Sequence, residues 1–137
     1  MAGETNLTRL LSSMQPICRE GEYVFCTVAA SGSLDLDPIG FFKEEEGLTL
    51  ILSQHQAEAA GLPYSATFAM ITLSVHSSLE AVGFLAAIAT KLASHGISVN
   101  PVSAFYHDHL FVPVAQAEAA IALLHELAAE SGSTSSP

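Results

Sequence analysis

The chain has 137 residues, half of them hydrophobic, and its mean hydropathy is +0.41. This length and composition suit one packed domain or two very small ones, and they exclude a largely disordered chain. Fourteen acidic residues against four basic ones give a formal net charge of −10, which leaves too few cations to bind phosphate backbones or anionic lipids. We therefore expect no nucleic-acid partner and no membrane partner.

The pattern of apolar residues predicts a cytoplasmic protein. The longest apolar stretch, residues 81–89, is about half as long as a membrane-spanning helix. The first residues include Glu4 and Arg9 and lack the apolar core of a secretory signal. Cys18 and Cys26 match no zinc or redox spacing, so we interpret them as reduced thiols, with a disulfide or a nucleophilic role as the alternatives.

The first half of the chain predicts the order helix, strand, strand, helix. Asn6 caps a helix, and apolar residues at helical spacing follow it. The aromatic and β-branched run over residues 22–29 predicts a strand buried on both faces, and residues 48–53 predict a second strand. A loop, a short strand or turn, and a short helix are expected over residues 31–38, 41–46 and 54–60.

The second half predicts the order strand, helix, strand, strand, helix. Residues 68–75 alternate as a strand does, and Ser77 or Ser78 then caps a helix that Gly96 ends. The remaining elements are two strands and a helix over residues 97–105, 110–112 and 117–128, followed by a tail at 131–137 that we expect to be disordered.

This order is the ferredoxin-like pattern without its last strand. The predicted fold class is therefore α+β, with two tandem ferredoxin-like βαββαβ halves that have antiparallel sheets and helices on one face. We place the halves at residues 1–65 and 66–130. A lone three-stranded sheet leaves backbone groups unpaired, so the two halves could lend each other edge strands. Pairing of such edges between copies makes a homodimer our expectation.

Four segments carry a family resemblance: EEGLTLIL at residues 45–52, ITLSVHSSLEAVG at 71–83, HGISVN at 95–100 and YHDHLFVP at 106–113. Together they resemble the ACT domain, and the layout is similar to stand-alone bacterial tandem ACT proteins and to the paired regulatory domains of aspartate kinases. The resemblance implies an ACT-type fold and a regulatory or sensory protein that binds a small molecule, by default an amino acid. It implies no cofactor and no catalysis.

The resemblance also implies where a ligand would bind, namely the loop after the first strand of the second half and the neighbouring strand. The residues carried over are His76, Ser77, Ser78, Leu79, Glu80, Ser98 and Asn100. A helix start there suits a ligand carboxylate, and Glu80 or a residue of the acidic run 44–46, such as Glu46, suits its ammonium group. The alternatives are that Ser77 or Ser78 only caps the helix, and that the acidic run is a solvated surface.

His107, Asp108 and His109 are the most enzyme-like feature of the sequence. Two histidines on one face of a strand can begin a transition-metal site, for which His76 is a further candidate ligand. One alternative function is therefore a metal-dependent hydrolase or lyase, and another is a protein-interaction module without a ligand. A polar hairpin turn accounts for the same three residues without a metal.

Overall fold

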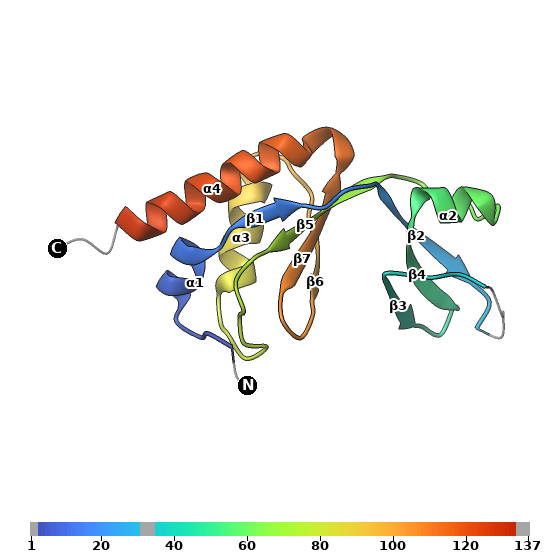
Figure 1. Cartoon of the computed structure of the whole chain (residues 1–137), viewed down its shortest axis with the longest axis horizontal. Coiled ribbons are helices and arrows are strands. Elements are labelled where there is room, and N and C mark those ends of the chain that lie inside the picture. The colour runs from blue at the N-terminus through green and yellow to red at the C-terminus, as the bar shows by residue number, and fades with distance from the viewer. Residues whose placement is uncertain (1–2, 31–34, 134–137) are drawn as a thin grey trace. The chain divides into compact units, whose positions relative to one another are not determined.

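A computed structural model of the chain describes residues 3–30 and 35–133 (Figure 1). The chain forms two compact units. The terminal unit joins Met1–Arg19 to Met70–Pro137, and the central unit is Glu20–Ala69. The expected division at residue 65 follows the order of the sequence, but in space residues 3–19 pack with the C-terminal elements.

The described residues of the terminal unit form four strands of a sheet, three α-helices and a short 3-10 helix. The helices are α1 (Leu7–Ser13), α3 (Phe84–Ala93), η1 (Val114–Gln116) and α4 (Ala117–Ser133). The strands are β1 (Pro16–Cys18), β5 (Phe68–Leu73), β6 (Asn100–Ser103) and β7 (Asp108–Pro113), of which β5 begins in the central unit.

Strand β1 provides the edge strand that is missing from the sequence pattern of the second half. It pairs antiparallel with β5, with Pro16 opposite Leu73 and Cys18 opposite Ile71. The strand order in this unit is β1-β5-β7-β6, and β6 pairs antiparallel with β7. An N-terminal strand thus completes a ferredoxin-like arrangement whose other strands come from the C-terminal half.

Helix α4 covers this sheet. It contacts β1 and β7, while α1 and α3 pack against α4 (Figure 1). The apolar stripe of each helix faces the interior, which explains why the periodic positions of the sequence are buried. The largest fully buried side chains of the unit are Leu10, Ile71, Leu73, Ile88, Leu92, Leu110, Phe111, Val112 and Leu124.

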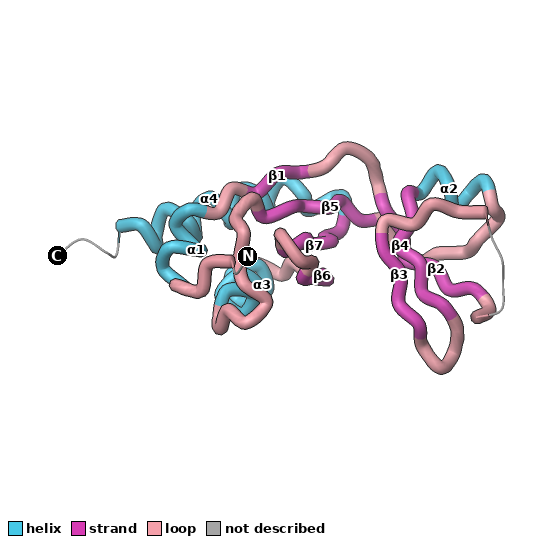
Figure 2. Tube along the Cα trace, turned by 60° about the horizontal axis from the view of Figure 1, so that its bottom comes forward, coloured by secondary structure: helices cyan, strands magenta, loops and turns pink. Residues whose placement is uncertain are grey.

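In its described residues, the central unit has three antiparallel strands and one helix, and Figure 2 shows these strands side by side. The strand order is β3-β4-β2, with bounds Gly40–Lys43, Leu48–Ser53 and Tyr23–Val28, and the helix α2 is Gln54–Ala59. Its core comprises Val24, Cys26, Leu50, Leu52 and Ala57.

Three expectations about these elements need correction. Strand β2 buries Val24 and Cys26 but exposes Thr27, so it is buried on one face and not on both. Helix α3 begins at Phe84 and not after Ser78, because the intervening residues form a loop with partners of its own. Helix α4 continues to Ser133, so residues 131–133 are helical, whereas residues 31–34 and 134–137 lie outside the described part.

No helix in the described residues is long and apolar enough to cross a bilayer.

Candidate functional site

The loop between β5 and α3, residues 74–83, is held in place by the N-terminal segment. The amide of Glu4 donates to the carbonyl of His76 at 2.8 Å, and the amide of Ser78 donates to the carbonyl of Glu4 at 2.9 Å. Gly3 lies so close that a Cβ there would be 2.6 Å from the carbonyl carbon of Ser77. The backbone of the loop is therefore fixed by residues more than seventy positions earlier in the chain.

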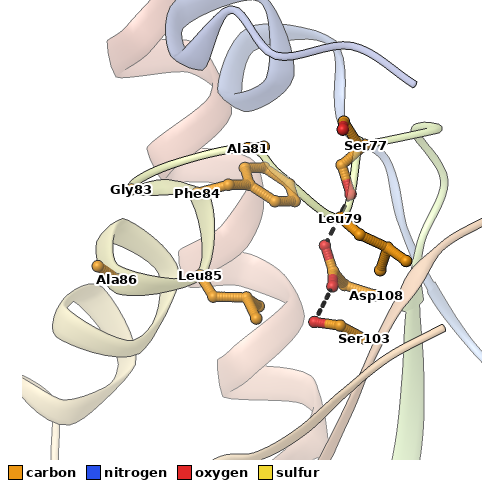
Figure 3. Close-up of a pocket in the computed structure, with 10 residues that line it drawn as sticks. Ser77, Leu79, Ala81, Gly83, Phe84, Leu85, Ala86, Ser103 and Asp108 are labelled. Atoms are coloured by element: carbon orange, nitrogen blue, oxygen red, sulfur yellow. Dashed lines mark hydrogen bonds between the residues drawn. The ribbon is translucent and has the colours of Figure 1, made fainter. Parts of the chain in front are cut away.

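Asp108 lies beside this loop and is buried. As the first residue of β7 it alternates with Leu110 and Val112, both fully buried, so its side chain points toward the interior. Its Oδ2 accepts a hydrogen bond from the hydroxyl of Ser77 at 2.9 Å, and its Oδ1 accepts one from the hydroxyl of Ser103 at 2.6 Å (Figure 3). Ser103 is directly opposite Asp108 in the β6–β7 pair.

These residues form one wall of a cavity of about 180 Å³. Its polar lining is Ser77, Ser78, Ser103 and Asp108, and its apolar lining is Leu79, Ala81, Phe84, Leu85 and Ala86 together with Gly83 (Figure 3). The lining of the cavity therefore combines hydroxyl and carboxylate groups with apolar side chains.

The start of α3 opens into the same cavity. Its N-cap is Gly83, which has a φ of 92° in the left-handed region and makes no side-chain capping bond. Phe84, Leu85 and Ala86 form the first turn and line the cavity. The amides of a first helical turn have no partner within the helix, and their dipoles favour a negative charge. The helix start is thus able to bind a carboxylate.

The structure brings some of the expected site residues together and not others. Ser77, Ser78 and Leu79 line the cavity, whereas His76 and Glu80 belong to the same loop but do not line it. Ser98 is exposed, and Asn100 lies at the end of β6 remote from Ser103, where it pairs with Phe111. Glu46 is exposed in the turn between β3 and β4 of the central unit.

The serines also have a role that differs from the expected one. Neither caps α3, because Ser77 donates to Asp108 and the hydroxyl of Ser78 accepts from the amide of Glu80 within a turn. Sequence reasoning missed Ser103, and it considered Asp108 only as a turn residue or, in the alternative, as part of a metal site. The signal for Asp108 was present, since it shares a strand face with Leu110 and Val112.

The histidines around Asp108 do not form a metal centre. Within residues 3–30 and 35–133, no three His, Cys, Asp or Glu side chains gather as metal ligands. The rings of His107 and His109 are 6.4 Å apart, and His76 contacts the ring of Tyr106 with centroids 5.4 Å apart. Asp108 points away from both neighbouring histidines and is engaged by the two serines. The cluster of ligands expected for the metal-dependent alternative is therefore not found in the part of the chain that is described.

His109 instead belongs to a structural chain of hydrogen bonds. Its Nδ1 lies 3.0 Å from the hydroxyl oxygen of Thr72, which also accepts from Nε of Arg19 at 3.0 Å. Burial lowers the pKa of His109, and the positive charges of His107 and Arg19 lower it further, against a smaller opposite effect of Asp108. The neutral imidazole is therefore the form that fits this position.

Comparisons with known proteins agree with this architecture. The chain matches the ACT domain twice, over residues 2–69 and residues 66–126. No curated protein matches it. A crystal structure of a Vibrio cholerae protein of unknown function, described as a possible transport protein, is 52% identical with a TM-score of 0.80, covering 89% of this chain and 95% of that one.

Two more distant structures share the fold. An Agrobacterium tumefaciens protein is 17% identical with a TM-score of 0.70, covering 84% of this chain and 89% of that one. The ligand-free regulatory subunit of aspartate kinase from Thermus thermophilus is 9% identical with a TM-score of 0.63, covering 85% of this chain and 97% of that one. With two consecutive matches that span most of its length, the chain belongs to the ACT-domain family of regulatory, small-molecule-binding domains.

Proposed function

We propose that the protein is a non-catalytic sensor of a free amino acid, which binds in the cavity between the 74–83 loop and the start of α3. The observation that carries this proposal is the open helix start. Gly83 leaves the first turn of α3 uncapped, and that turn lines a cavity of about 180 Å³. A ligand carboxylate there would accept hydrogen bonds from backbone amides and interact favourably with the helix dipole.

The other contacts of the ligand follow from the rest of the lining. Ser77 and Ser78 contribute polar groups to the cavity, and Leu79 and Leu85 offer an apolar surface for a side chain. Because the loop is fastened to Glu4, a ligand that orders or shifts it would change how the N-terminal segment packs. That change is the regulatory output we propose.

A thermal-shift screen of the full chain against the twenty amino acids tests this function. A ligand that binds only the folded state raises the melting temperature, by an amount that grows with its concentration relative to its Kd. We expect one or a few related amino acids to raise it, and a Gly83→Pro variant to lose that shift because its backbone cannot adopt the same φ. A screen in which no amino acid at millimolar concentration raises the melting temperature would refute the proposal.

We also propose that the protein is cytoplasmic and forms a homodimer. Two free cysteines, Cys18 and Cys26, suit a reducing compartment. Strand β3 is an edge of the sheet of the central unit, and its Phe41 and Phe42 are 62% and 71% exposed. Paired edges would cover these rings. Light scattering coupled to size-exclusion chromatography checks this, and we expect a Phe42→Ser variant to elute as a monomer.

The same exposed rings favour a second candidate function, an interaction module that contacts a partner enzyme through β3 and needs no ligand. It predicts no thermal shift with any amino acid, together with a stable complex that the Phe42→Ser variant fails to form.

A further inference from the structure

Asp108 is a buried carboxylate at the cavity wall. Its exposed fraction is 5%, and both oxygens accept hydrogen bonds from serine hydroxyls, as an ionised carboxylate does. Ser77 approaches it from the loop and Ser103 from the opposite strand, so the carboxylate is held from two sides (Figure 3). Its orientation is fixed before any ligand arrives.

Asp108 takes part in no ion pair within the described chain. The ion pairs found there involve Arg9 with Glu4 and Lys91 with Glu126 and Glu130. Two hydroxyl donors occupy about half of the roughly four acceptor positions of a carboxylate. Burial of a charge is costly unless it is paired, so the free acceptor positions on a cavity wall favour a ligand group that carries both a positive charge and N–H donors.

The size of the cavity limits what such a ligand can be. Pockets for drug-sized molecules measure about 300–1,000 Å³, whereas this one measures about 180 Å³. A nucleotide or an organic cofactor is too large. The remaining lining is apolar, apart from the serines and the helix start. A small primary amine with a short apolar body fits this combination of volume and polarity.

We infer that Asp108 recognises the ligand by binding its protonated amino group. Ser77 and Ser103 are positioning residues that orient the carboxylate of Asp108. The inference rests on the function proposed above and assigns specificity within it. The site then selects amino acids over the 2-hydroxy acids and simple carboxylic acids of the same shape. The ammonium group of the ligand is then bound by Asp108 on a strand and not by Glu80, which lies outside the cavity lining.

Calorimetric titration of the full chain tests the inference with matched probes. The first probe is the amino acid that gives the largest thermal shift, and the second is the 2-hydroxy acid with the same side chain. A hydrogen bond to a charged group predicts that wild-type protein binds the hydroxy acid about 10- to 100-fold more weakly. This comparison uses no variant and therefore does not depend on how a substitution affects folding.

The Asp108→Asn variant isolates the residue. We expect it to bind the amino acid about 10- to 100-fold more weakly and to bind the hydroxy acid as wild type does. The effect of substituting Asp108 then depends on whether the probe carries an amino group. The matched control is Asp37→Asn, which removes one exposed carboxylate of the central unit, where the hydrogen bonds to Gln56 use backbone atoms of Asp37. The control should bind both probes as wild type does.

The outcomes separate this inference from the proposed function. If wild type and Asp108→Asn bind the amino acid equally, or if the hydroxy acid binds as tightly as the amino acid, the role of Asp108 is refuted while ligand binding stands. If neither probe class binds wild-type protein, the proposed function fails and the inference fails with it.

Discussion

The hydroxyl of Ser77 donates to Oδ2 of Asp108 at 2.9 Å, and this bond joins the loop before α3 to the first residue of β7. A Ser77→Ala variant leaves a buried carboxylate oxygen without its donor, which costs about 1–3 kcal/mol. We expect the free energy of unfolding, measured by urea denaturation, to fall by that amount. Ser78→Ala is the control, because the hydroxyl of Ser78 serves only a local turn, and its effect should stay within about 0.5 kcal/mol. Equal urea midpoints for Ser77→Ala and wild type would show that the bond contributes nothing.

Gly3→Ala should loosen the loop that forms the cavity. The new Cβ would meet backbone atoms of Ser77 and Ser78 at 2.6 and 2.7 Å, so the N-terminal segment must move away from the loop. We expect the amide of Ser78, which donates to the carbonyl of Glu4, to exchange with solvent faster in a hydrogen-exchange measurement. In the control Gly132→Ala, the new Cβ is at an ordinary contact distance of 3.8 Å from Ser12. Unchanged protection of Ser78 in Gly3→Ala would contradict this account.

His109 should make the protein less stable in mild acid. Because burial lowers its folded-state pKa, the folded protein binds this proton less readily than the unfolded chain does. Above about pH 6.5, the ordinary pKa of histidine, His109 does not destabilise the protein in this way. The free energy of unfolding declines as the pH falls from there toward the lowered pKa. An NMR titration should give an imidazole midpoint below 6.5 for the signal that disappears in His109→Gln. A midpoint at or above that value would remove the basis for the decline.

The two cysteines should differ in reactivity. Cys18 is exposed, whereas Cys26 is buried and its burial raises the pKa of its thiol. A chromogenic disulfide reagent should modify one thiol rapidly in native protein and both after denaturation. The fast phase should disappear in Cys18→Ser and persist in Cys26→Ser. Two fast thiols in the native wild type would mean that the core of the central unit opens readily.

Local patterns predicted much of the fold. The alternation at residues 48–53 coincides with β4, and the cap at Asn6 with the start of α1, because both depend on neighbouring residues. Strand β1 was missed, since three residues after a helix carry no periodicity and gain a strand partner only through β5. The start of α3 was placed too early because Ser77 and Ser78 resemble capping residues, while their actual partners lie on β7 and within the loop.

The site was predicted only in part, because its residues too have partners on elements that are distant in the sequence. The loop could be located from a resemblance, but the carboxylate beside it could not, because Asp108 and Ser77 are thirty-one residues apart. The His-Asp-His spacing drew attention to its two histidines, yet the strand alternation places Asp108 on the opposite face, toward the core. Sequence spacing showed which residues share a face and not which face is buried.

The pairing of β1 with β5 makes the central unit a nested insertion. Cys18 is opposite Ile71, and the amide of Arg19 donates to the carbonyl of Met70 at 2.8 Å, so the chain leaves and re-enters the terminal unit at adjacent points. A cut near residue 65 would deprive the C-terminal portion of a sheet strand and of the segment that fastens its loop. Excision of the insertion, with a short turn closing a β1–β5 hairpin, would by contrast keep every residue that lines the cavity in a single polypeptide.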